Sequence, residues 1–286
     1  MGRRGGVLDP TLDLYDQAFA LLAAAWWARA SGDRSPFTAA DETLEVIDWR
    51  LAAPSGLGWW SEDGASASML QDPHMHLLDG VTALDDAVGD MRYRGRMRSI
   101  LDVFEQALFD PMTRTVAERF DPMWKRVAGA DGVAVMPGHH YEWIWLLHRA
   151  AAKIPGADRW TEALFAFAER AGRDAQSGLV LEEVLEDGRV AKRSFRIWEN
   201  SEAVKAHLAR FERSGTIDAR RLDELLVTLF SRFLYGPVDG TWIDRLDARL
   251  APVEPKIPSS SLYHLFLAIA ELLRLEPALR AAGRLD

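Results

Sequence analysis

The chain has 286 residues, of which 48% are hydrophobic, so it is long enough to bury a large core. Its formal net charge of -9 argues against a nucleic-acid binder, which would need an excess of lysine and arginine on one face. Because cysteine is absent, disulfides, thiolate metal sites and a cysteine nucleophile are all excluded.

Membrane association is also not expected. The longest apolar stretch, residues 18–28, is about half of the length that spans a bilayer. The N-terminal segment lacks the continuous apolar run of a signal peptide. These features predict a protein without a membrane partner and with a cytoplasmic location.

The first two elements are predicted to be a pair of helices. Apolar residues recur at steps of three and four over residues 12–30, and Gly32 follows this run. A second helix is expected to begin at Phe37, with Thr38 as its cap, and to end at the Pro-Ser-Gly break of residues 54–56. An irregular loop comes next, and the same unit then repeats.

Three similar helix pairs follow, and a fifth pair is expected to begin near Tyr263. The predicted helices cover residues 74–88 and 93–109, 139–154 and 157–171, 198–211 and 217–235, with a short last helix after Pro277. The segment after residue 171 predicts a β-hairpin that turns at Asp187 and Gly188.

Equivalent positions at the start of each pair recur at a nearly constant interval. They are Tyr15, His76, His139, Trp198 and His264, separated by 61, 63, 59 and 66 residues. A period of two helices plus a loop predicts a stacked or circular array of helical hairpins, which we expect to form a single domain over residues 1–286. In a circular array, the first helix of each pair would face the centre and open toward the same end.

Three of these positions, His76, His139 and His264, carry imidazoles. Imidazole gains and loses its proton near neutral pH, so two of them across a substrate can act as general acid and base. A single histidine near a helix end is usually a hydrogen-bonded structural residue. Three histidines in register favour a shared functional site instead.

A metal site is the alternative interpretation of this region. His74, His76, His139 and Glu142 have the ligand types of a zinc site or of an iron site with two histidines and one carboxylate. Residues two apart at a helix start point about 200° apart, so His74 and His76 would converge on one ion only if the chain were extended there. We therefore expect a site without metal or cofactor.

Trp198 and Glu202 lie four residues apart and share one face of a predicted helix. One interpretation is an aromatic core residue beside a solvated charge. The other is a stacking surface for a sugar ring with an acceptor for its hydroxyls. The position of both residues in the repeat favours the second interpretation.

Five segments, taken in order, resemble the N-acylglucosamine 2-epimerase superfamily, which includes mannose isomerases and cellobiose 2-epimerases. They are DLYDQAF (13–19), PHMHLLDG (73–80), PGHHYEW (137–143), RIWENSEAVKA (196–206) and SSSLYHLF (259–266). The resemblance covers nearly the whole chain and implies an all-α fold, an (α/α)6-type barrel of helical hairpins with short β-hairpins in its loops.

The sequence predicts five helix pairs, one fewer than the six hairpins of the family's (α/α)6 barrel. The family's first hairpin, with a substrate-binding arginine, would precede Asp13, so we expect either a start further upstream or a natural truncation. An open ring of five hairpins would expose the apolar flanks of its end units.

The resemblance implies a role for each site residue. His139 and His264 would be the proton-transfer pair, and His76 would assist ring opening and hold the sugar. Glu142 would bind hydroxyls and orient His139. The remaining residues expected to bind substrate are Trp198, Glu202, Tyr15 and Asp72.

The mechanism implied is metal-free: the sugar ring opens, the proton at C2 is removed and a cis-enediol(ate) forms. Protonation at C1 then gives aldose-ketose isomerisation, whereas protonation on the opposite face of C2 gives epimerisation. We expect a mannose-fructose type of isomerase, with a small-molecule sugar as partner and a homodimer as an option. The alternatives are a 2-epimerase acting on N-acylglucosamine or another aldose, or a truncated, non-catalytic sugar-binding homologue.

Some positions depart from the family pattern. Asp72 and Asp79 stand where the family more often has Asn and Glu, and Glu199-Asn200 replaces a common Pro-Gln or Pro-His. The cellobiose enzymes carry a second tryptophan shortly before the last histidine, and this chain has none before His264. This difference favours a monosaccharide substrate.

Overall fold

The computed structural model describes residues 9–63, 69–236, 238–253 and 256–284. These residues contain nine α-helices and only short strands, so the mostly helical fold predicted from the sequence is confirmed. None of the helices in these ranges combines the length and hydropathy needed to cross a membrane.

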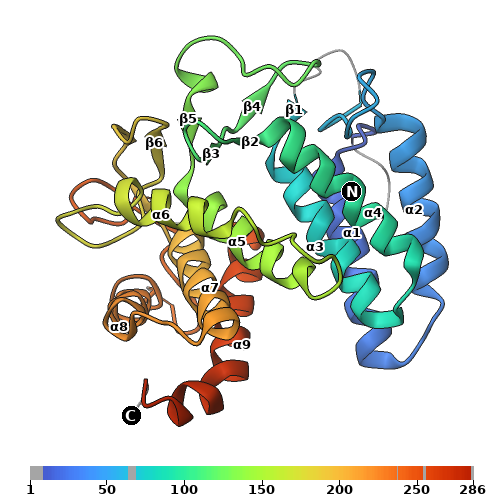
Figure 1. The fold of residues 1–286 in the computed structure, drawn as a ribbon. Helices are drawn as coiled ribbons and strands as arrows, with labels where there is room; N and C mark the ends of the chain where they lie inside the picture. Colours follow the sequence, from blue (N-terminus) through green and yellow to red (C-terminus); the bar gives the residue numbers. More distant parts are fainter. Residues whose placement is uncertain (1–8, 64–68, 237, 254–255, 285–286) are drawn as a thin grey trace. The chain divides into compact units, whose positions relative to one another are not determined.

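The chain divides into two compact units; Figure 1 labels the helices and strands of each. The first unit comprises Met1–Asp110, Val116–Val133 and Ala152–Pro155, and the second comprises Pro111–Thr115, Ala134–Ala151 and Gly156–Asp286. A single domain over the whole chain stays a prediction.

Two helical hairpins form most of the first unit. They consist of α1 (Leu14–Ser31) with α2 (Pro36–Leu51), and α3 (Asp72–Val88) with α4 (Met91–Val103). Helix α1 packs against both α2 and α3, and α4 continues into a π-helical turn, η1 (Phe104–Leu108). Strand β1 (Met69–Leu70) pairs antiparallel with β4 (Arg119–Phe120). Strand β2 (Phe109–Asp110) pairs with β3 (Thr115–Val116), and a 3-10 turn, η2, covers Ala130–Gly132.

Local sequence accounts for the position of α1 against α3. The side chain of Asp13 accepts hydrogen bonds from two backbone N–H groups of the first turn of α1, and Gly32 ends the helix in the left-handed conformation with φ of 75°. In α3, a Cβ atom at Gly80 would lie 2.7 Å from the carbonyl oxygen of Ala18. Glycine therefore permits the close approach of the two helices.

The second unit is built around α7 (Ile197–Ser214), which packs against both α5 (Pro137–Ala151) and α9 (Ser259–Ala281) (Figure 1). Its other helices are α6 (Thr161–Ala171) and α8 (Ala219–Thr228), and α8 runs into a π-helical turn, η3 (Leu229–Phe233). A three-stranded antiparallel sheet contains β5 (Ala134–Val135), β6 (Glu183–Leu185) and β7 (Val190–Lys192), and β8 (Phe195–Arg196) pairs with β9 (Arg245–Leu246). Strands β6 and β7 flank Asp187 and Gly188, which confirms the predicted β-hairpin.

Two predictions about helix ends are wrong. The expected break before a short last helix is absent, because α9 runs through Pro277 to Ala281 as one helix. A proline inside a helix removes one hydrogen bond, and here the side chains of Leu275 and Leu279 on either side are buried. Thr38 does not cap α2 either, since Pro36 occupies the first helical position, which proline favours.

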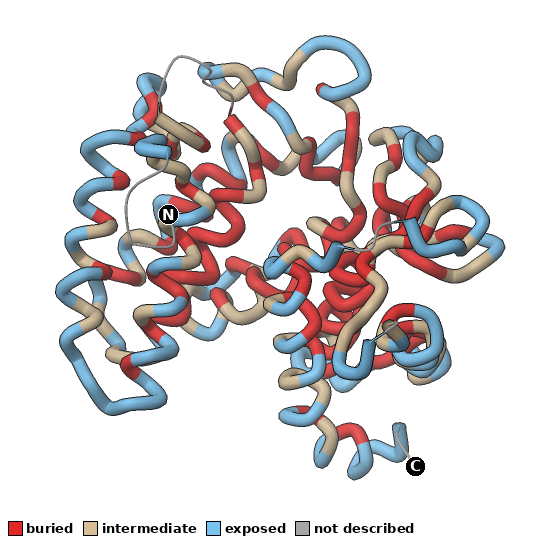
Figure 2. The backbone as a smooth tube through the Cα atoms, turned by 180° about the vertical axis from the view of Figure 1, so that it is seen from behind, coloured by how far each residue is buried: buried red, intermediate tan, exposed pale blue. Residues whose placement is uncertain are grey.

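The first helix of the later pairs is the more buried one, as the sequence predicts. Every residue of α3 from Pro73 to Asp85 is buried, and so is every residue of α7 from Ile197 to Ala209. Helix α8, in contrast, buries only Arg221, Leu222 and Leu225. Figure 2 shows this contrast, with some helices buried almost without a break and others exposed at regular intervals.

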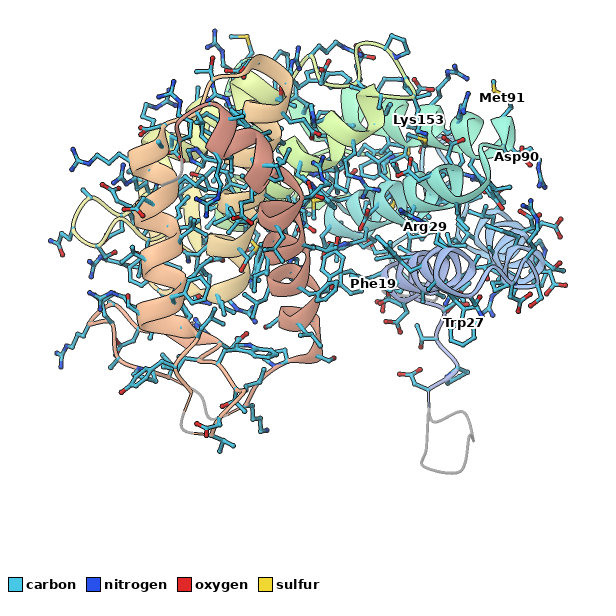
Figure 3. The ribbon with its side chains drawn as sticks, turned by 90° about the horizontal axis from the view of Figure 1, so that it is seen from below. Phe19, Trp27, Arg29, Asp90, Met91 and Lys153 are labelled. Atoms are coloured by element: carbon cyan, nitrogen blue, oxygen red, sulfur yellow. The ribbon has the colours of Figure 1, made fainter. Side chains whose placement is uncertain are left out.

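Exposed apolar residues occur on α1 and α9, as they do on other helices, and the exposure expected at the flanks of an open ring stays a prediction. On α1, Trp27 is 62% exposed and points away from the ribbon in Figure 3. On α9, the exposed residues recur at steps of four, three and four: Leu262, Phe266, Ile269 and Leu273.

Candidate functional site

Five of the predicted site residues gather in the second unit, on three helices. His139 and Glu142 come from α5, Trp198 and Glu202 from α7, and His264 from α9. Glu142 and Glu202 have no exposed surface, His264 is 6% exposed and His139 is half-buried. These side chains form what we call the α7 cluster.

The two histidines of the α7 cluster lie against the same indole ring. The ring centroid of Trp198 is 5.1 Å from that of His139 and 5.1 Å from that of His264. Gly138 makes the first contact possible, because a Cβ atom there would lie 2.7 Å from both the Trp198 ring and Cγ of Glu199. The Pro-Gly start of α5 therefore delivers His139 onto α7.

His264 is held by carboxylates. Its Nδ1 lies 2.7 Å from Oε1 of Glu202 and 3.8 Å from Oε1 of Glu142. The hydroxyl of Tyr263 donates a hydrogen bond of 3.4 Å to the same Glu142 oxygen. Oε2 of Glu202 forms an ion pair of 2.9 Å with the ammonium of Lys205, which has no exposed surface.

These contacts determine the protonation state of His264. Burial lowers the pKa of His264 below its usual value of 6.5, against the opposing effect of the Glu202 carboxylate, and the charges of Lys205 and His139 lower it further. The pKa of Glu202 is lower than its usual value of 4.5. Burial acts to raise it, but the charge of Lys205 and the hydrogen bond from His264 have a larger, opposite effect. Because a carboxylate only accepts hydrogen bonds, Nδ1 of His264 carries the proton and Nε2 has the lone pair.

Glu199 is a buried acid next to this cluster whose chemistry the sequence did not reveal. Burial raises its pKa to about 8, and the nearby charge of Glu182 adds to this effect, so the side chain is neutral at pH 7. Its Oε2 accepts a hydrogen bond of 3.2 Å from the backbone N–H of Arg196. The sequence does place Glu199 at the third position of a helix, where a glutamate side chain can accept from the backbone N–H of the N-cap residue in a capping box.

Tyr15, Asp72 and His76 lie in the first unit. The Tyr15 ring packs edge-on against His76 at 4.7 Å between centroids, and Phe19, labelled in Figure 3, lies 4.8 Å from the same imidazole. His76 is buried, and Asp72 is half-buried at the start of α3. The meeting of His76 with the other two histidines stays a prediction.

His74 is a structural residue, so the metal site that included it is not supported. Its Nδ1 lies 3.0 Å from the carbonyl oxygen of Leu70, and its Nε2 accepts a hydrogen bond of 3.2 Å from the backbone N–H of Trp59. Both ring nitrogens are therefore engaged. Burial lowers the pKa of His74 to about 4, which keeps it neutral.

Glu142, Glu202 and His264 place ligand atoms within 4.8 Å of one another, a spacing that suits a metal ion. In this arrangement, however, Lys205 already neutralises Glu202, and the Nδ1–H group of His264 points at the same carboxylate. An ion would have to displace both partners. The contacts thus describe a hydrogen-bonded ion-pair cluster.

Comparison with known proteins places this chain among sugar isomerases and epimerases. Residues 1–268 match the family N-acylglucosamine 2-epimerase (GlcNAc 2-epimerase). A mannose-6-phosphate isomerase of Rhizobium meliloti (strain 1021) is 31% identical, over 94% of this chain and 71% of the relative. A D-mannose isomerase of Thermobifida fusca is 29% identical, over 98% of this chain and 74% of the relative.

The fold matches as well. A crystal structure of a D-mannose isomerase superposes with a TM-score of 0.83 at 20% identity, and the match covers 94% of this chain and 74% of that protein. Over this share, the helices have the arrangement of the (α/α)6 barrel isomerases and epimerases.

Proposed function

Because this chain belongs to the N-acylglucosamine 2-epimerase family of sugar isomerases and epimerases, we propose that it interconverts an aldose and a ketose of the mannose-fructose type. Two of its relatives are named for isomerisation of mannose or its 6-phosphate, which supports isomerisation over epimerisation. The observation that carries the proposal is the contact of His139 and His264 with one indole ring beside two buried carboxylates.

In this proposal the two histidines share the proton transfers. In the open-chain aldose, the C1 carbonyl acidifies the proton at C2, and one imidazole removes that proton as a general base. The electron pair of the C2–H bond forms the double bond of a cis-enediol(ate), and O1 takes up a proton. Return of a proton to C1, with loss of the proton on O2, gives the ketose.

The environment of His264 supports its part in this exchange. A lowered pKa keeps the imidazole neutral near pH 7, and Glu202 fixes the proton on Nδ1, so Nε2 has the lone pair that a base needs. His139 is half-buried, so it retains some access from solvent. Glu202 orients His264 and stabilises the imidazolium when it forms.

Substrate binding falls to the aromatic and acidic side chains around the histidines. The Trp198 ring offers an apolar face to the sugar, and Glu142 offers an acceptor for its hydroxyls. For Tyr15, Asp72 and His76, in the first unit, the proposed roles in sugar binding and ring opening rest on the resemblance to the family.

Proton NMR of mannose incubated with the protein in D2O tests the proposal. We expect fructose to appear with deuterium at C1. Deuterium at C2 of two aldoses would instead identify a 2-epimerase. Binding of mannose without exchange of any carbon-bound proton would refute both forms of the proposal and identify a non-catalytic sugar-binding protein.

A further inference from the structure

Lys205 is a buried cation for which the mechanism above has no role. It lies on α7, three residues after Glu202, and neither side chain has any exposed surface. Its Nζ lies 2.9 Å from Oε2 of Glu202, 3.8 Å from the ring centroid of Trp145 and 5.4 Å from that of Tyr263. One carboxylate and two aromatic faces therefore offset the cost of burying the ammonium group.

The contacts form a continuous path from Lys205 to His264. Each oxygen of the Glu202 carboxylate has a different partner, since Oε2 faces Lys205 and Oε1 faces Nδ1 of His264. With both oxygens engaged, the plane of the carboxylate and the orientation of the imidazole are restricted. Loss of Lys205 would leave the Glu202 carboxylate free to rotate, with less positive charge beside it.

The charges around His264 oppose one another. On the packed helices, the carboxylates of Glu202 and Glu142 lie 2.7 Å and 3.8 Å from Nδ1 and favour the protonated ring, whereas Lys205 and the charge of His139 oppose it. On α9 itself, Tyr263 packs edge-on at 4.8 Å between ring centroids. Without Lys205, the two carboxylates would face His264 with less cationic opposition.

We propose that Lys205 is a positioning residue: it holds the Glu202 carboxylate in place and thereby fixes His264 as the neutral tautomer with its proton on Nδ1. This inference rests on the proposed function, because it describes how His264 is prepared for proton exchange. Lys205 acts through Glu202 and does not touch the reacting carbons.

Nitrogen-15 NMR of histidine-labelled protein tests the inference without any turnover. In the wild type, His264 is expected to be neutral with its proton on Nδ1 at pH 7. In Lys205→Met, the same resonance should titrate at a higher pH, because a nearby cation has been removed. An unchanged titration in Lys205→Met would overturn the inference, whatever the fate of the proposed sugar chemistry.

The pH dependence of kcat/KM provides the second readout. We expect the limb that reports His264 to move to higher pH in Lys205→Met, so that the ratio of activity at pH 6 to that at pH 8 falls below that of the wild type. A purely structural role for Lys205 would lower activity at every pH without moving either limb, and that result would contradict the inference.

Two further variants serve as controls. Lys205→Arg keeps the positive charge and should restore the wild-type titration of His264. Arg210→Met removes another ion pair of α7, the one with Glu162 at 2.9 Å, and should leave that titration unchanged. If Lys205→Met does not fold, the wild-type spectrum decides, because an imidazolium ring or a proton on Nε2 at pH 7 would overturn the inference.

Discussion

Replacement of Glu202 by glutamine tests the core of the α7 cluster. The substitution keeps the size of the side chain but removes the negative charge that accepts from His264 and pairs with Lys205. A hydrogen bond to a charged group contributes about 1.5–3 kcal/mol. If this amount is lost from transition-state stabilisation, kcat should fall about 10- to 150-fold.

Stability should fall at the same time. Glu202→Gln leaves the Lys205 ammonium buried without a counter-charge, and breaking a buried ion pair in this way costs about 3–5 kcal/mol. Chemical denaturation would measure the change in free energy of unfolding. Glu162→Gln is the matched control, because Glu162 is 66% exposed in its pair with Arg210, and it should cost at most about 1 kcal/mol.

The kinetic assay follows mannose turnover by NMR, with kcat determined from initial rates at saturating sugar and at a temperature where both proteins are folded. A kcat within twofold of the wild type would refute the reasoning, because the carboxylate would then not assist His264. Equal destabilisation by Glu202→Gln and Glu162→Gln would show that the buried pair is no more important than a surface pair.

Two other predictions concern neighbouring residues. Trp198→Ala should raise KM about 3- to 10-fold with a smaller change in kcat, because it removes an aromatic face from the sugar site. Trp49→Ala, at a position that is 82% exposed, is the control and should change neither constant. Steady-state kinetics would contradict the prediction if Trp198→Ala lowered kcat at constant KM. The pKa of Glu199 is raised to about 8 in the folded protein, so between pH 4.5 and 8 the folded protein keeps a proton that the unfolded chain has released. The free energy of unfolding should therefore fall as the pH rises through this range, by up to about 1.4 kcal/mol per pH unit. Glu199→Gln should flatten this dependence in denaturation curves recorded across that range, and an unchanged slope would count against a neutral Glu199.

The helical layout could be predicted from sequence because apolar spacing follows the helix period. The pattern placed the pairs of helices and the hairpin at Asp187 and Gly188, and it separated the buried α7 from the more exposed α8. It failed at Pro277, where tertiary packing outweighs the tendency of proline to end a helix. Local patterns do not report such packing.

The candidate site was only partly predictable. His139, Trp198 and His264 could be identified because their positions repeat and their segments resemble a known family. The role of His74 as a structural residue could not be seen, because its partners are backbone groups, at Leu70 and Trp59, whose positions the sequence pattern does not fix. Lys205 also escaped notice, since a lysine in a helix is normally solvated and only the packing of α5 and α9 on α7 buries it.

The most direct test of the account compares exchange of carbon-bound hydrogen with D2O, measured as deuterium at C1 of the fructose formed from mannose, for the wild type, His139→Gln and His264→Gln. The account predicts exchange in the wild type and a loss of about two to four orders of magnitude in each variant, as expected for general acid-base catalysts. Exchange at the wild-type rate in either variant, with the protein folded, would contradict the claim that these two imidazoles move the proton.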